Sequence, residues 1–161
     1  MTHKTSSAVL TDSMQQWATL LDLAAKEVFQ MMVGGELLSC ETEDPECGDI
    51  TAMIGLAGEL CGLMAIRCSA ECACHIASAM LGMDVATLDG GALDALGEIC
   101  NMVAGNFKAK VSGLADGCVL SVPTVIRGTD YEWHAVGEGS SIIVLESFNG
   151  CPIQIRLTVH Q

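Results

Sequence analysis

Two apolar segments lie close together near the middle of the chain, at residues 49–56 and 60–68, with only Ala57, Gly58 and Glu59 between them. Each segment has the length of a strand rather than that of a typical helix. A short connection that contains glycine is typical of a β-hairpin. Because the two strands of a hairpin run antiparallel, the fold must contain an antiparallel sheet.

Helical periodicity appears on both sides of this hairpin. Apolar residues recur every three or four positions before it, where Thr11–Ser13 offers candidate N-caps and Gly34 ends the run. After it, Ser69 and Glu71 are suited to the first turn of a second helix that stops at Gly82. The three expected helices span residues 11–33, 69–81 and 88–111.

The remaining strand signals lie mostly in the last third of the chain, where Gly, Asp and Asn separate short apolar runs. The pattern of helix, strands, two helices and strands predicts an α+β fold, with a largely antiparallel sheet covered by helices on one side. At 161 residues we expect a single domain over residues 1–161. Besides the hairpin, the expected strands span residues 36–40, 118–122, 124–128, 133–136, 141–146 and 151–159.

Charge and cysteine content restrict the class of partner. The formal net charge is −13, which repels phosphate backbones and anionic lipid surfaces, so we expect no nucleic-acid binding and no membrane insertion. Residues 1–13 contain no apolar run of signal-peptide length. The nine cysteines are an odd number without paired spacing, which suits reduced thiols in a core. We therefore expect a soluble cytoplasmic protein.

The helix expected over residues 88–111 has an unusual polar face. At 100° per residue, Asp94, Glu98, Asn101 and Gly105 lie within about 60° of one another. The apolar side chains gather on the opposite side. Asn and Gly cost up to roughly 1 kcal/mol each against Ala inside a helix, so stability alone does not explain them. The simpler interpretation is a solvated helix face, and periodicity alone does not decide between the two.

The spacing of these residues carries a resemblance. Asp94-x-x-x-Glu98-x-x-Asn101, with Gly105 after it and Pro123 farther along, resembles the signature of the CheC/CheX/FliY family of chemotaxis phosphatases. The order of helices and strands agrees with that family over nearly the whole chain. One good copy of the motif makes the chain most similar to the CheX members.

The resemblance implies an activity and roles for the motif. The family hydrolyses the aspartyl-phosphate of a CheY-like response regulator, whose receiver domain supplies the Mg²⁺, so this chain needs no cofactor of its own. By resemblance, Asn101 places the attacking water and Glu98 pairs with a lysine of the partner. Asp94 either contacts the partner or caps its own helix, Gly105 leaves room for the partner, and Pro123 shapes the loop beside the site.

Two further expectations come with the resemblance. CheX members pair through their sheets, so a homodimer is expected, and the last third of the chain offers strand edges that need cover. The alternative to a phosphatase is a non-catalytic adaptor of the same fold that docks a receiver or a flagellar-switch component. Retention of both Glu98 and Asn101 favours the enzyme.

A weaker echo of the motif lies in the first helix. Glu27-x-x-Gln30-x-x-x-Gly34 repeats the spacing, but Leu23 stands where Asp94 does and no proline follows at the matching distance. We interpret this copy as an inactive relic of a duplication, which predicts a pseudo-twofold internal repeat in the fold.

A cysteine-rich stretch over residues 68–75 offers a competing function. Cys68, Cys72 and His75 would share one helix face, and all three are ligands for zinc or other soft metals. The spacing matches no zinc or iron–sulfur pattern. Cysteines such as Cys74 are also explained without a metal, as small apolar residues on a buried helix. The sequence therefore predicts structural thiols and no metal.

Overall fold

The computed structural model describes residues 4–43, 45–111, 113–129, 131, 134 and 139–160, with side chains described from residue 13 onward. The helices are α1 (Lys4–Val28), the π-helical turn η1 (Phe29–Val33), α2 (Ala70–Leu81), α3 (Gly90–Lys110) and α4 (Leu114–Gly117). The strands are β1 (Leu38–Ser39), β2 (Ile50–Gly58), β3 (Cys61–Cys68), β4 (Cys118–Leu120), β5 (Thr124–Arg127), β6 (Gly139–Phe148) and β7 (Cys151–His160).

All seven described strands form one antiparallel sheet. Their order is β1-β6-β7-β3-β2-β4, and β5 pairs with β2 beyond the end of β4. The central hairpin is confirmed as β2 and β3, whose register places Ile50 opposite Cys68 and Leu56 opposite Gly62. The α+β class and the antiparallel sheet predicted from the sequence are therefore confirmed.

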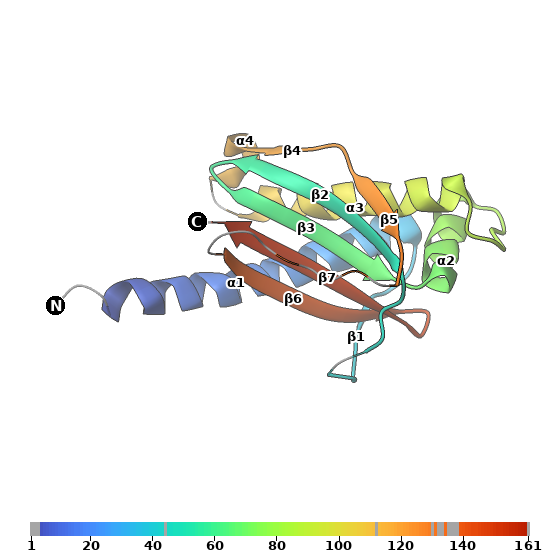
Figure 1. The fold of residues 1–161 in the computed structure, drawn as a ribbon, viewed down its shortest axis with the longest axis horizontal. Helices are drawn as coiled ribbons and strands as arrows, with labels where there is room; N and C mark the ends of the chain where they lie inside the picture. Colours follow the sequence, from blue (N-terminus) through green and yellow to red (C-terminus); the bar gives the residue numbers. More distant parts are fainter. Residues whose placement is uncertain are drawn as a thin grey trace.

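The long helices α1 and α3 lie side by side across one face of the sheet, and α2 lies at one end (Figure 1). Strand residues that point to this face are apolar and fully buried, as in β2, where Ile50, Ala52 and Ile54 alternate with residues of the other face. From the helix side, Phe107 meets Trp17 edge to face at 6.3 Å between ring centroids. The core lies between the helices and the sheet.

Two short strands, β4 and β5, form the edge of the sheet next to β2, and the chain leaves the sheet between them. Strands β4 and β5 pair with opposite ends of β2, and residues 121–123 connect them. Ser121 bridges the break, since its backbone N–H donates to the Gly55 carbonyl at 2.9 Å and its hydroxyl accepts from the Gly55 N–H at 2.8 Å. Pro123, which has no N–H to give to a ladder, follows at the interruption.

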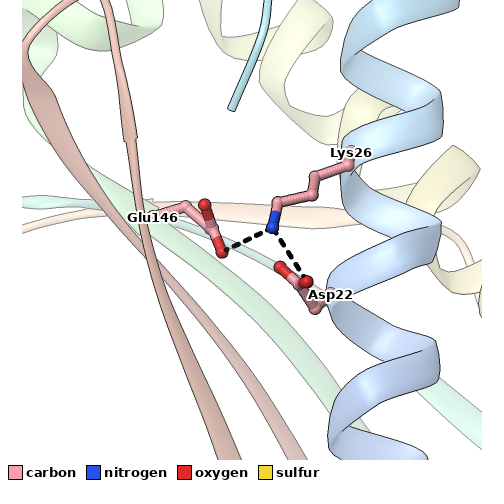
Figure 2. A network of polar contacts seen from close by, with 3 residues as sticks. All are labelled: Asp22, Lys26 and Glu146. Atoms are coloured by element: carbon pink, nitrogen blue, oxygen red, sulfur yellow. Dashed lines mark hydrogen bonds and ion pairs between the residues drawn. The ribbon is translucent and has the colours of Figure 1, made fainter. Parts of the chain in front are cut away.

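A buried charged group joins α1 to the sheet (Figure 2). Glu146 of β6 is 3% exposed, and the Lys26 ammonium lies 3.8 Å from its Oε1 and 2.9 Å from Asp22 Oδ2. Burial and the neighbouring Asp22 carboxylate raise the pKa of Glu146 to about 7. The hydrogen bond to Asp22 in turn raises the pKa of Lys26.

Several sequence-based boundaries need correction. The first helix begins at Lys4, so Thr11–Ser13 lies inside it and caps nothing. Its end at Gly34 agrees with expectation, because that residue adopts φ of 71° and its N–H closes the last turn on the Phe29 carbonyl. The strand expected over residues 36–40 shortens to β1, and the helix α4 was not predicted.

The strands predicted over residues 133–136 and 141–146 have different outcomes. The strand predicted over residues 133–136 falls mostly outside the described residues, and His134, which is described, is exposed and lies in no strand. The strand expected at 141–146 is longer than predicted and runs over the whole of β6.

None of the described helices combines the length and the apolar character needed to cross a membrane.

Candidate functional site

Helix α3 is fixed at both ends by its own sequence. Asp89 is its N-cap, and the carboxylate accepts a hydrogen bond from the Ala92 N–H at 2.9 Å. Lys108 and Lys110 lie in the last turn, where cations favour the negative end of the helix dipole. Because Asp89 supplies the cap, Asp94 does not, and the capping alternative for Asp94 is wrong.

One face of α3 is buried and the other carries the motif. The apolar side predicted from the sequence is confirmed, since its members are fully buried: Leu96, Ile99, Cys100, Val103 and Phe107. On the other side, Asp94 and Glu98 are exposed, and Asn101 and Gly105 are partly exposed. A side chain added at Gly105 would meet no atom within 4 Å. The turn after Asn101 is therefore open to an approaching surface.

The motif side chains of this face lack partners in the part of the chain that the structure describes. Within the described part of the structure, neither the Glu98 carboxylate nor the Asn101 carboxamide has a hydrogen-bond or ion-pair partner. A carboxamide carries both donors and acceptors, and a carboxylate accepts several hydrogen bonds. Both groups are thus available to a ligand or to another protein.

Pro123 forms a wall beside the motif. A Cβ built at the buried Gly97 would lie 3.5 Å from the Pro123 Cβ and 3.5 Å from a methyl group of Val125. Gly97 directly precedes Glu98, and these ordinary van der Waals distances show that the β4–β5 connection packs beside α3 at this point. The segment brings one further feature to the site, because Val122 is 84% exposed next to Pro123.

Comparison with known proteins identifies the family of this chain. The family model described as chemotaxis phosphatase CheX matches residues 50–146, which include both α3 and Pro123. The chain belongs to the CheX family.

Relatives and solved structures of the CheX family cover different shares of the chain. The CheY-P phosphatase CheX of Thermotoga maritima is 35% identical over 89 residues, which is 55% of this chain and 57% of that protein. The chemotaxis protein CheX of Vibrio vulnificus has a TM-score of 0.77 at 26% identity, covering 89% of this chain and 96% of that one.

A CheX–CheY–BeF₃–Mg²⁺ complex from Borrelia burgdorferi contains a chain with a TM-score of 0.76 to this one. Its identity is 22%, and the match covers 90% of this chain and 98% of that one. At this identity the likeness shows that the two chains share a fold.

The first-helix echo has different surroundings from the motif of α3. Glu27 accepts hydrogen bonds from Lys110 Nζ at 2.7 Å and from Asn106 Nδ2 at 2.9 Å, both on α3. These bonds hold the pKa of the Glu27 carboxyl below its usual range. Gln30 is exposed within η1, and Gly34 ends the helix rather than lying inside it. Glu27 is thus already used to join α1 to α3.

The cysteine-rich stretch also differs from the arrangement considered from sequence. Cys68 and Cys72 are fully buried and Cys74 is nearly so. The contact with Cys68 and burial raise the pKa of the Cys72 thiol, which keeps it protonated. Among the described residues, Cys68, Cys72 and His75 do not converge on one point, whereas Glu71, His75 and the distant Cys151 do. Nothing in the sequence spacing indicated that Cys151 would join them.

Proposed function

We propose that this chain hydrolyses the aspartyl-phosphate of a CheY-like response regulator. The observation that carries the proposal is the open face of α3, where the exposed Glu98 and the partly exposed Asn101 have no partners in the described structure, beside Pro123 and the open turn at Gly105. The similar Thermotoga protein is a CheY-P phosphatase and the similar Borrelia chain is in a complex with CheY, and both support the choice of substrate.

Asn101 is the proposed catalytic residue. Hydrolysis of a phospho-aspartate requires a water in line with the bond that breaks, and a carboxamide can hold that water because its oxygen accepts and its nitrogen donates. The half-exposed position of Asn101 on a rigid helix lets it enter a neighbouring active site without rearrangement of its own backbone. The water attacks phosphorus, and the phosphoryl group leaves the receiver's aspartate as inorganic phosphate.

Glu98 and Asp94 are proposed to bind and orient the partner. Glu98 lies one helical turn before Asn101 on the same face, so an ion pair between its carboxylate and a receiver lysine would fix the register in which Asn101 enters. Because Asp89 supplies the helix cap, we propose that Asp94 contacts the partner from the same face. Neither carboxylate acts as a nucleophile.

The segment around Pro123 is proposed to form the apolar part of the contact. Val122 is 84% exposed in the connection that packs on α3, and an exposed apolar side chain beside the motif favours a protein interface. This segment packs beside α3 at Gly97, which directly precedes Glu98. The contact would therefore combine a polar helix face with an apolar rim.

The Mg²⁺ of the reaction is assigned to the receiver. It neutralises charge on the phosphoryl oxygens, and the Borrelia complex is named as containing Mg²⁺ together with CheY. We place the reaction in the cytoplasm, because all nine cysteines are free thiols and a reducing compartment keeps them so.

The direct test is to mix the purified chain with a phosphorylated CheY-like receiver and Mg²⁺ and to follow release of inorganic phosphate. We expect decay faster than the receiver's own. Decay at the receiver's own rate, together with measurable binding, would instead support the non-catalytic adaptor that docks a receiver or a flagellar-switch component.

We also propose that the chain forms a homodimer. Strand β1 covers only Glu146 and Ser147 of β6, so the outer edge of β6 over residues 139–144 has no strand partner among the described residues. Such an open edge favours pairing with a second chain. Sedimentation equilibrium at micromolar concentration should give the mass of a dimer, and a monomer mass would contradict the proposal.

A further inference from the structure

A set of three metal-ligand side chains lies at the end of the molecule where α2 meets the β6–β7 turn. The Glu71 carboxylate, a ring nitrogen of His75 and the Cys151 sulfur lie within 4.8 Å of one another. Glu71 and His75 are four residues apart on α2 and so share one face of the helix. Cys151 approaches that face from the first position of β7.

The backbone holds Cys151 in this position. Asn149 and Gly150 form the two-residue turn between β6 and β7, with φ of 49° and 80°, as a tight hairpin requires. Cys151 is opposite Phe148 in the strand register, and the ring of Phe148 is buried against Phe29 at 5.4 Å between centroids. The thiol therefore comes from a rigid hairpin end rather than from a flexible loop.

One ring nitrogen of the half-buried His75 has no partner among the described residues. Its Nδ1 atom is inaccessible to solvent and has no hydrogen-bond partner in the described structure. A buried polar nitrogen without a partner is unfavourable, so a group that bonds to this imidazole would stabilise the arrangement. Glu71 is exposed, so one side of the three-residue set is open to an incoming ion.

The donor chemistry identifies the class of ion. One thiolate sulfur, one imidazole nitrogen and one carboxylate oxygen suit a borderline-soft divalent cation such as Zn²⁺, whereas Mg²⁺ and Ca²⁺ prefer oxygen ligands alone. Ligand atoms around tetrahedral zinc lie about 3.3–3.8 Å apart, which follows from bond lengths of about 2.0–2.3 Å. The ligand atoms must therefore close by at most about 1 Å, and the exposed Glu71 side chain can supply that movement.

We propose that Glu71, His75 and Cys151 form a site for a divalent cation of the zinc class, with water completing the coordination. The sequence alone predicts no metal for this chain, because the spacing over residues 68–75 matches no zinc or iron–sulfur pattern, and Cys151 lies far from that stretch. Binding requires the Cys151 thiol to lose its proton to solvent as the metal–sulfur bond forms. The bound ion would tie the β6–β7 turn to α2.

The test uses Co²⁺ as a spectroscopic probe on the purified chain, with no receiver present. We expect one Co²⁺ per chain, a thiolate-to-cobalt absorption band, and loss of the band when Zn²⁺ is added. Cys151→Ser should abolish the band, and His75→Gln should weaken Co²⁺ binding at least about tenfold. The exposed thiol control Cys61→Ser should change neither.

Circular dichroism of each variant tests whether the fold is intact, and only variants with the parent spectrum are compared. A parent chain without the band, or a band that persists in Cys151→Ser, would overturn the site. Because the measurement needs neither receiver nor phosphate, it succeeds or fails independently of the proposed phosphatase activity.

Discussion

Helices α1 and α3 lie side by side on the same face of the sheet and carry the same spacing of Glu, amide and Gly, yet their polar groups have different surroundings (Figure 1). Glu27 of α1 is bound by Lys110 and Asn106, whereas Glu98 of α3 has no partner among the described residues. A side chain that is already bonded inside the chain is unavailable to another protein. The comparison separates a structural copy of the motif from a copy open to a partner.

The glycines of the two copies differ in the same sense. Gly34 adopts the left-handed conformation that ends the helix, and so it is required for the backbone. Gly105 lies inside α3 with empty space at its Cβ position, where the backbone requires no glycine. The lower helix stability that Gly105 causes relative to Ala is explained if a partner approaches that turn.

Other charged groups of α1 follow the same pattern. Asp22 and Lys26 face the buried Glu146 and join α1 to β6 (Figure 2). We therefore expect changes to the polar residues of α1 to alter stability and leave activity unchanged. Changes to the exposed face of α3 should do the reverse.

The largest effect is expected at Asn101. If its carboxamide places the attacking water, Asn101→Ala should slow dephosphorylation about 100-fold or more, which is about 2.7 kcal/mol of barrier. Receiver binding should remain, and the denaturation midpoint should stay or rise slightly, because Ala is the better helix former. A binding titration and a urea melt on the same variant check both statements.

The next effect concerns the stability of the α1 contact with the sheet. The folded pKa of Glu146 is about 7, above the usual 4.5, so from pH 4.5 to 7 the folded state keeps a proton that the unfolded state has lost. The free energy of unfolding should fall across that range by on the order of 2 kcal/mol. The raised pKa of Lys26 acts only at much higher pH.

Denaturant unfolding at pH 5 and pH 8 measures this slope, and Glu146→Gln should flatten it. A parent chain equally stable at both pH values would show that the buried carboxylate does not hold its proton.

A smaller effect is expected at Glu98. Glu98→Ala should weaken receiver binding by about tenfold, because it removes a charge-assisted contact, and the remaining binding should depend less on salt. Titration of the receiver at two salt concentrations tests this. Unchanged affinity with slower turnover would move Glu98 from binding into catalysis.

The smallest effect on activity is expected in the first copy. Gln30→Ala should change the dephosphorylation rate less than twofold, because Gln30 lies on η1 next to a Glu27 that is bonded within the chain. Glu27→Gln should lower the denaturation midpoint slightly, more at low salt, without loss of activity. Loss of most activity in Gln30→Ala would mean that the chain works with two sites.

Much of this arrangement could be predicted from periodicity. The hairpin, the end of α2 at Gly82 and the buried face of α3 follow from local patterns of apolar residues and glycines. The start of α1 could not be located from the sequence, because several Ser and Thr residues before Trp17 are suitable N-caps and the helix runs through the polar Thr11–Ser13. Helix boundaries are poorly determined where several candidate caps follow one another.

The contacts between distant segments could not be predicted. The bond from Lys110 to Glu27, the packing of Pro123 on Gly97 and the approach of Cys151 to His75 each join elements far apart in sequence. Local spacing identified Glu98 and Asn101 as unusual. Only the fold shows that the corresponding Glu27 is bonded to α3, and that the face of α3 with Glu98 and Asn101 is open.

The most direct test is single-turnover decay of a phosphorylated receiver with parent, Asn101→Ala and Gln30→Ala chains under one set of conditions. The account predicts that Gln30→Ala matches the parent and that Asn101→Ala decays at least about 100-fold more slowly while still binding the receiver. An Asn101→Ala chain that dephosphorylates at the parent rate would contradict the assignment of the α3 face as the catalytic site.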